Sequence, residues 1–168
     1  MPAKMAPRRS FDGAPTHVLH PGDVVCVGRG SRLETLLGSC VSVILSDCNR
    51  TVAAMCHIVH PDRPIAGPGD LTRGAPGAID RMYELLSARG MTPKLCEAWI
   101  YGAGDMFPSM FKHTHVGFRN AQAVLQRLDA DGVTVTLQDL GGRSYRLLKW
   151  TVGVGLPAVT ANAIEVMQ

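Results

Sequence analysis

Val41-Ser-Val-Ile-Leu45 and Thr51-Val-Ala-Ala-Met-Cys-His-Ile-Val59 are two runs of apolar and β-branched residues, joined by Ser46-Asp-Cys-Asn-Arg50. Polar, turn-forming residues between two such runs predict an antiparallel β-hairpin. If the hairpin folds about residue 48, Cys40 and His57 fall nearly opposite each other. Opposed residues have Cβ atoms about 5 Å apart, so the pattern predicts a contact between a thiol and an imidazole.

Shorter patterned segments surround this hairpin. Strands are predicted at residues 23–27, 95–101, 133–137 and 144–152, and helices at 78–89 and 121–128. Residues 61–76 are rich in proline and glycine and are predicted to form a loop. Because strands outnumber helices and the helices fall between groups of strands, a layered α/β domain is expected. Residues 1–17 lack periodicity and are predicted to be a disordered tail, with one domain at 18–168.

The composition narrows the class of protein. The chain has 168 residues, 46% of them hydrophobic and 18% charged, which fits one globular domain. No apolar run reaches the roughly 18 residues that span a bilayer, so membrane insertion is not expected. No apolar stretch follows the basic residues of the first 15 positions, which argues against a secretory signal. The net charge is only +3, and aromatic residues do not alternate with basic ones, so nucleic acid is not an expected partner.

Cysteine usage points to a reducing compartment. Five cysteines, an odd number, occur without any Cys-x-x-Cys pair. Such usage predicts reduced thiols and a cytoplasmic protein, in which most of the cysteines are inert core residues.

Gly38-Ser39-Cys40 stands immediately before the first strand of the hairpin. Glycine permits a sharp turn, so the Cys40 thiol can project at the entry of the strand. The backbone N–H groups at Gly38, Ser39 and Cys40 could then line an oxyanion site. A thiol is mostly protonated at neutral pH, and a neighbouring imidazole such as that of His57 can accept its proton. From the spacing alone, the favoured interpretation is an inert buried cysteine beside a core histidine.

The runs LLGSCVSVILSD (36–47) and AAMCHIVHP (53–61) together resemble the CheD family, the chemoreceptor glutamine deamidases of bacterial chemotaxis. Weaker matches follow in the family's order, namely YGAGDM (101–106), VGFRN (116–120) and DLGGR (139–143). The resemblance implies an α/β fold, a single-domain layered sandwich of mixed and antiparallel β-sheets flanked by two main helices. It also implies a Cys–His–Thr site, in which Cys40 matches the nucleophile and His57 the base. Thr35 best matches the threonine that orients the histidine; an ordinary β-branched strand residue is the alternative.

The implied reaction requires neither a metal nor an organic cofactor. Cys40 attacks the side-chain carbonyl of a receptor glutamine, His57 gives a proton to the leaving ammonia, and water hydrolyses the thioester to leave glutamate. The implied partners are the cytoplasmic domains of methyl-accepting chemoreceptors and, in some members, a CheC-type phosphatase; some members also remove methyl esters. The alternative function is a non-catalytic adaptor that binds such a phosphatase. A cysteine protease is a third alternative, although no residues indicate the extended cleft that a peptide substrate requires.

Two departures from the family pattern concern the neighbourhood of the site. His60 stands where an apolar residue commonly precedes the proline, and the usual glycine-glycine-alanine block reads Gly102-Ala103-Gly104. Either could alter the fit of substrate or the choice of partner.

Other polar clusters carry weaker signals. A zinc ion could in principle be ligated by Cys48, Cys56, His57 and His60. Cys56 and His57 would, however, point to opposite faces of one strand. His113 and His115 are expected to lie in a solvated loop. Trp99 and Trp150 fall within apolar strands and are expected in the core.

Overall fold

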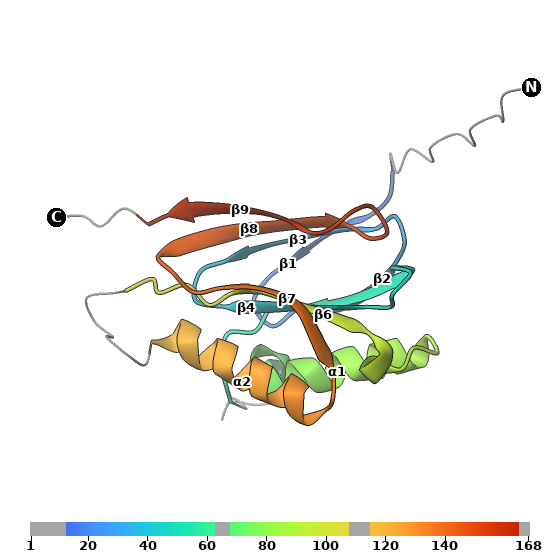
Figure 1. Ribbon diagram of the computed structural model, residues 1–168, viewed down its shortest axis with the longest axis horizontal. Coiled ribbons are helices and arrows are strands. Elements are labelled where there is room, and N and C mark those ends of the chain that lie inside the picture. The colour runs from blue at the N-terminus through green and yellow to red at the C-terminus, as the bar shows by residue number, and fades with distance from the viewer. Residues whose placement is uncertain (1–12, 63–67, 108–114, 165–168) are drawn as a thin grey trace, which may run out of the picture.

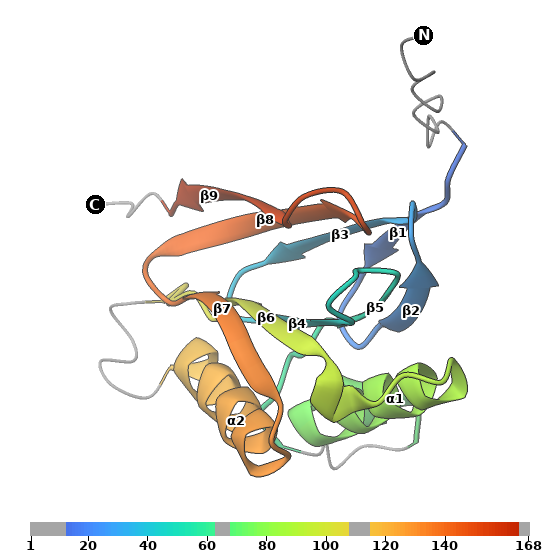
Figure 2. The same cartoon turned by 45° about the vertical axis from the view of Figure 1, so that its right-hand side comes forward.

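Two β-sheets and a layer of helices make up the fold in the computed structural model, which describes residues 13–62, 68–107 and 115–164 (Figures 1 and 2). Sheet A has the order β1-β3-β8-β9 (Thr16–Leu19, Arg32–Leu37, Ser144–Thr151 and Ala158–Ala163). Sheet B has the order β2-β5-β4-β6-β7 (Val24–Gly28, Val52–Cys56, Val41–Ser46, Glu97–Gly102 and Thr134–Leu140). The helices α1 (Ala75–Ala88) and α2 (Val116–Ala130) cover the face of sheet B that points away from sheet A. The predicted layered α/β sandwich, with mixed and antiparallel pairing and two main helices, is confirmed.

Several element boundaries differ from the prediction. The helices α1 and α2 begin three and five residues earlier than the apolar periodicity indicated, at Ala75 and Val116. Part of the predicted loop is therefore helical, since the 3-10 helix η1 (Pro68–Arg73) also falls within it, and residues 63–67 lie outside the described residues. A second 3-10 helix, η2 (Pro93–Leu95), precedes β6. Strands β1, β3 and β9 were not predicted. Of the predicted tail, residues 1–12 lie outside the described residues, and β1 begins at Thr16.

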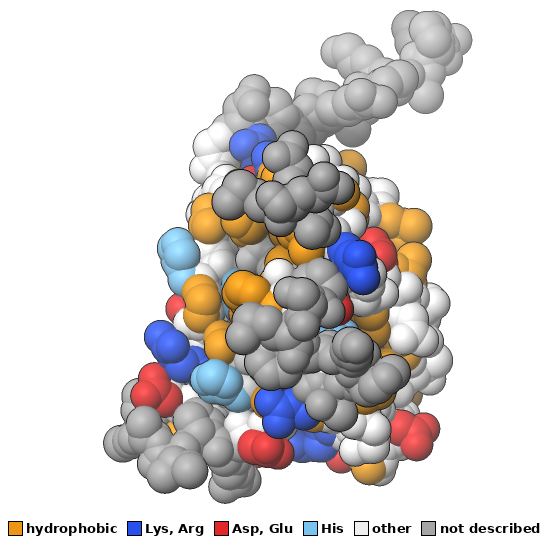
Figure 3. All heavy atoms as spheres, turned by 90° about the vertical axis from the view of Figure 1, so that its left-hand side faces the viewer, with side chains coloured by type: hydrophobic (Ala, Val, Ile, Leu, Met, Phe, Trp, Pro, Cys, Tyr) orange, Lys and Arg blue, Asp and Glu red, His pale blue; other side chains and the backbone are white. Residues whose placement is uncertain are grey.

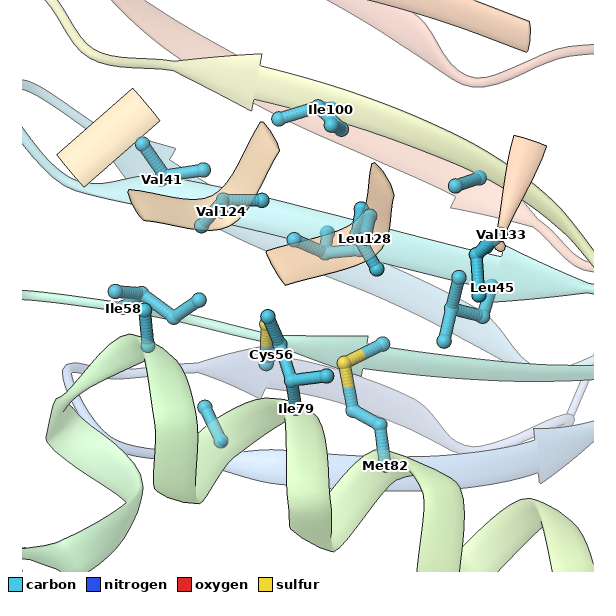
Figure 4. Close-up of a cluster of buried hydrophobic side chains, with 14 of the residues drawn as sticks. Val41, Leu45, Cys56, Ile58, Ile79, Met82, Ile100, Val124, Leu128 and Val133 are labelled. Carbon is cyan, nitrogen blue, oxygen red and sulfur yellow. The ribbon is translucent and has the colours of Figure 1, made fainter. Parts of the chain in front are cut away.

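Two apolar layers hold the sandwich together. The first lies between sheet B and the helices and includes Val41 and Ile58, which turn toward α1 and α2 in Figure 4. The second lies between the two sheets, where Trp99 of β6 packs edge-on against Trp150 of β8 with ring centroids 5.1 Å apart. The prediction that both tryptophans are core residues is confirmed. Because side chains alternate along a strand, the neighbours of Val41 and Ile58 face the layer between the sheets.

The hairpin of β4 and β5 forms as predicted, but its register is shifted by two residues. Ile44 pairs with Met55 and Val41 pairs with Ile58, so the hairpin folds about a point between residues 49 and 50 rather than about residue 48. The cause is the turn, where the Asp47 carboxylate accepts the N–H groups of Thr51 and Val52 and the Thr51 hydroxyl. This closes a five-residue loop at 47–51, between Ser46 of β4 and Val52 of β5. Cys40 and His57 are therefore not directly opposite.

Within residues 13–62, 68–107 and 115–164, no helix has both the length and the apolar character needed to cross a membrane.

Candidate active site

Cys40 lies in the turn between β3 and β4, immediately before β4 begins. Its side chain is half-buried and packs against the apolar layer between the sheets. The segment after β6 runs alongside this turn, because the Gly104 N–H donates to the Gly38 carbonyl (2.9 Å) and the Ala103 N–H donates to the Cys40 carbonyl (2.8 Å). The thiol thus stands on a backbone that is fixed to sheet B while it keeps partial access to solvent.

His57 and Thr35 are brought together across the two sheets. His57 follows β5 of sheet B, Thr35 lies in β3 of sheet A, and both side chains are buried. Thr35 Oγ1 lies 2.8 Å from His57 Nδ1 and also 2.8 Å from the Leu19 carbonyl oxygen. A hydroxyl has one proton and a carbonyl only accepts, so Thr35 donates to Leu19 and accepts from the Nδ1–H of His57. The neutral imidazole therefore carries its proton on Nδ1, which leaves the Nε2 lone pair free to act as a base.

Cys40 and His57 are diagonal neighbours on one face of sheet B. With Val41 paired to Ile58, His57 stands opposite Ser42, two residues along the strand from Cys40. Both side chains face the layer between the sheets, away from the helices. Diagonal neighbours have Cα atoms about 7–8 Å apart, and an aromatic side chain can span that separation. No other strand intervenes, since β4 and β5 are adjacent in the sheet.

The backbone of His57 is held by the turn that precedes β2. The His57 N–H donates to the Asp23 carbonyl (3.1 Å), and the His57 carbonyl accepts the Gly22 N–H (2.9 Å). Together with the bond to Thr35, these contacts leave the imidazole little freedom to rotate. A base on a rigid strand is better oriented than one on a free loop.

Burial shifts the two titrating groups in opposite directions. Desolvation lowers the pKa of His57 below its ordinary 6.5, and it outweighs the Leu19 carbonyl and the Asp23 charge, which raise it. Desolvation also raises the pKa of the Cys40 thiol above its ordinary value. Both shifts favour the neutral forms, a protonated thiol at Cys40 and an uncharged imidazole at His57.

The conformation of Ala103 turns its carbonyl away from the N–H of Cys40. Ala103 is a non-glycine residue with a positive φ of 57°, and its carbonyl is turned toward Gly117 in the first turn of α2. In an ordinary ladder that carbonyl would accept the N–H of Cys40, because the Ala103 N–H already donates to the Cys40 carbonyl. Among the described residues, the N–H groups of Gly38, Ser39 and Cys40 donate to no carbonyl or side chain. A left-handed alanine is costly, and such strain is typical of functional sites.

Arg146 fixes the other side of the 102–104 segment. This β8 residue is 5% exposed, and its guanidinium donates to the carbonyls of Gly102 (3.1 Å) and Gly141 (2.8 Å) and to the Asp139 carboxylate (3.2 Å). The ion pair joins sheet A to sheet B directly behind the backbone that contacts Cys40. Sequence reasoning missed Arg146, although a single arginine inside an apolar strand was a signal for a buried ion pair.

The remaining polar candidates do not converge. Among the residues that the structure describes, no three His, Cys, Asp or Glu side chains are arranged to hold a metal ion. Cys48 is exposed in the turn between β4 and β5, whereas Cys56 is buried on the helix side of sheet B. His115 caps the start of α2 by accepting the Phe118 N–H through Nδ1 (3.2 Å), and His113 lies outside the described residues.

The surface beside the turn of Cys40 is partly apolar. A small cavity of about 60 Å³ is lined by residues around Ser39, among them Met106, Phe107 and Val116. Phe107 and Phe118 are respectively 62% and 49% exposed. Figure 3 views the molecule from the side on which α2 begins and shows hydrophobic side chains reaching the surface between charged ones.

Comparison with known proteins gives one consistent family. The family model described as "CheD chemotactic sensory transduction" matches residues 69–156. A probable chemoreceptor glutamine deamidase CheD 2 of Geobacter sulfurreducens is 35% identical over 77% of this chain and 79% of its own length. A probable chemoreceptor glutamine deamidase CheD of Pseudomonas syringae pv. syringae is 31% identical over 90% of this chain and 87% of its own. A solved structure from Neisseria meningitidis, of the family DUF152, has a TM-score of 0.49 and 14% identity over 84% of this chain and 76% of its own. The family-model match begins after Thr35, Cys40 and His57.

Proposed function

Because the chain belongs to the CheD family, we propose that it is a chemoreceptor glutamine deamidase, with Cys40 as nucleophile, His57 as general base and acid, and Thr35 as the residue that orients His57. The observation that carries the assignment is the bond of 2.8 Å between Thr35 and His57 on the sheet face that also bears Cys40. An inert core cysteine needs no such oriented base. The adaptor alternative makes no use of these three side chains.

The reaction begins from the neutral pair. His57 Nε2 takes the thiol proton as the Cys40 sulfur attacks the side-chain carbonyl carbon of a glutamine. The oxyanion that forms accepts the backbone N–H of Cys40, with Ser39 and Gly38 as neighbouring donors. The imidazolium returns its proton to the leaving nitrogen, and ammonia departs to leave a thioester. Water, deprotonated by His57, then attacks the thioester and releases glutamate and the free thiol.

The proposed substrate is inferred from the relatives, which are named probable chemoreceptor glutamine deamidases. We expect the cytoplasmic domains of methyl-accepting chemoreceptors to be the substrate, which requires the protein to be cytoplasmic. A CheC-type phosphatase is a further proposed partner, and it rests on the family resemblance alone. The test of the substrate is mass spectrometry of receptor cytoplasmic fragments incubated with the purified protein. Conversion of glutamine to glutamate at defined positions is expected; a wild-type protein that converts no glutamine in any receptor fragment would support the adaptor instead.

The pH dependence follows from the lowered pKa of His57. Only the neutral imidazole can accept the thiol proton, and its pKa lies below 6.5. We expect kcat/KM for deamidation to rise with pH below 6.5, as His57 loses its proton, and to be level at pH 7. Alkylation of Cys40 by iodoacetamide should keep rising beyond pH 9, because the thiol pKa is raised. An alkylation rate that is already level at pH 6 would instead indicate a resting thiolate–imidazolium pair.

Protonation of His57 should also cost stability. Its folded-state pKa is depressed, so the stabilising contribution of the neutral ring is complete above the unfolded value of 6.5 and is lost as pH falls through the lower folded value. Chemical denaturation between pH 7 and pH 5 measures this loss, and His57→Gln, which cannot titrate, should reduce it.

Thr35 provides a separate test of the base. Thr35→Val keeps the shape of the side chain but removes the acceptor of the His57 Nδ1–H, which frees the ring to take the other tautomer. We expect kcat to fall about 10²-fold and the free energy of unfolding to fall by about 1–3 kcal/mol, since a buried donor is left without a partner. Thr35→Ser restores the hydroxyl and should retain most of the activity. Equal loss in both variants would mean that packing, and not the hydrogen bond, is what Thr35 supplies.

A further inference from the structure

The ladder between β4 and the segment that carries His57 opens at the position of Cys40. Val41 and Ile58 exchange both backbone hydrogen bonds (3.0 and 2.8 Å). In a continued ladder, the next bond would run from the His60 N–H to the Ser39 carbonyl. The His60 N–H instead donates to the Arg73 carbonyl (3.1 Å), and the Val59 N–H donates to the same oxygen (2.8 Å). The two chains therefore diverge into a fork, with Cys40 on one arm and Val59 on the other.

Asn120 of α2 fills this fork. Its side chain is completely buried, and Nδ2 donates to the Ser39 carbonyl and to the Val59 carbonyl, each at 3.0 Å. Both partners are carbonyl oxygens, so the orientation of the amide is determined: the NH₂ group faces the fork. Asn120 thereby replaces the missing ladder bond and joins the arm of the nucleophile to the arm of the base.

The bond to Ser39 acts on the N–H of Cys40. The Ser39 carbonyl and the Cys40 N–H belong to one planar peptide group and point in opposite directions. Fixing the carbonyl therefore fixes the direction of the N–H. Donation to the carbonyl also polarises the peptide and strengthens its N–H as a donor. Because of the left-handed conformation of Ala103, the same N–H has no acceptor within the described part of the chain.

The amide oxygen of Asn120 argues against a role in stability alone. Among the described residues, Oδ1 is buried and has no hydrogen-bond partner. A buried acceptor without a donor lowers the stability of the fold, and asparagine is a weaker helix former than alanine. An asparagine whose buried amide oxygen has no partner lowers the stability of the helix. Its presence is explained if the two bonds of its NH₂ group serve the site.

We propose that Asn120 is a positioning residue for the deamidation reaction, which aims the Cys40 N–H at the oxyanion by holding the Ser39–Cys40 peptide while it keeps the His57 segment at a fixed distance. The inference rests on the proposed function. It separates the two halves of the site: Thr35 orients the base, and Asn120 orients the oxyanion donor.

The test is Asn120→Asp, which keeps the size of the side chain but sets a carboxylate against two carbonyl oxygens. We expect kcat for glutamine deamidation to fall about 10²-fold, with KM for the receptor fragment unchanged. The rate of Cys40 alkylation by iodoacetamide, which needs no oxyanion donor, should stay at the wild-type value. Gln122→Glu is the matched control, because Gln122 is an exposed amide on the same helix and the charge change is identical. It should leave all three quantities unchanged.

The outcomes separate this inference from the proposed function. A wild-type protein without deamidase activity contradicts the function, whereas an active wild type with an unchanged kcat in Asn120→Asp overturns the role of Asn120. A rise in KM alone would also overturn it, since a positioning residue does not contact the substrate. If Asn120→Asp fails to fold by circular dichroism, Asn120→Ser, which keeps one donor without a charge, is measured in the same way and is expected to lose kcat with unchanged alkylation. Alkylation that falls in parallel with kcat in the folded variant would show general disorder of the site and contradict the proposal.

Discussion

Cys40→Ala is expected to lower the rate of glutamine deamidation by about 10³-fold or more, because the proposed thioester forms on the Cys40 sulfur, whereas the neighbouring thiol of Cys56 is buried on the helix side of sheet B. The thiol is half-buried at the start of β4, so its removal should change the free energy of unfolding only slightly. The measurement is the rate of glutamine conversion in receptor fragments, followed by mass spectrometry, for variants whose folding is first verified by circular dichroism.

The matched control is Cys48→Ala. Cys48 is also a free cysteine, but it is exposed in the turn at the far end of the same hairpin. We expect wild-type activity from it. Equal rates for wild type and Cys40→Ala would rule out a cysteine mechanism, and activity lost equally in both variants would point to nonspecific thiol effects.

Gly102→Ala is expected to be the most destabilising single-methyl change near the site. Gly102 has a φ of 113°, and a Cβ built there would lie 2.2 Å from the carbonyl oxygen of Cys40. Either the left-handed backbone or the Cys40 carbonyl must move, and we expect a loss of about 3 kcal/mol in the free energy of unfolding. Deamidation should fall further than the fraction of unfolded protein explains, because the displaced carbonyl belongs to the nucleophile itself.

Gly90→Ala separates the effect of backbone strain from the effect of a steric clash. Gly90 also has a positive φ of 75°, but apart from its two chain neighbours no described residue has an atom within 4 Å of a Cβ built there. We expect a loss of about 1 kcal/mol by urea denaturation and unchanged deamidation. Should the two alanine variants lose the same stability and the same activity, the close approach of Gly102 to Cys40 would be of no consequence.

The hairpin could be predicted from the sequence because it depends on local patterns, whereas the roles of Cys40 and His57 were inferred from the family resemblance. Two apolar runs around a polar turn indicated β4 and β5, and a glycine before Cys40 indicated the turn that exposes the thiol. The register could not be predicted, because it depends on the Asp47 carboxylate capping a five-residue loop. A shift of two residues keeps side chains on the same face, so the predicted side of the sheet for Cys40 and His57 is retained.

The features that could not be predicted from the sequence depend on contacts between segments that lie far apart in the chain. Strands β1 and β9 are short and largely exposed, so they lack the apolar alternation that identifies a strand. Asn120 lies 81 residues from Ser39. Its proposed role depends on where the hydrogen bonding between β4 and the His57 segment ends, and no local sequence pattern predicts that point. The contacts of Arg146 and the conformation of Ala103 likewise arise only when β6, β7 and β8 come together in the folded protein. Thr35 was identified through family resemblance; its bond to His57 requires the two sheets to pack face to face.

The most direct measurement is covalent labelling with a receptor peptide in which a chloromethyl ketone replaces the side-chain amide of glutamine. The electrophilic carbonyl then sits where the scissile amide would bind, and mass spectrometry of the digested protein identifies the attacking atom. Addition of one peptide at Cys40, slowed in Thr35→Val and absent in Cys40→Ala, is the expected result. Inactivation with the label on any other side chain, or equal labelling of wild type and Cys40→Ala, would show that the Cys40 sulfur is not the nucleophile.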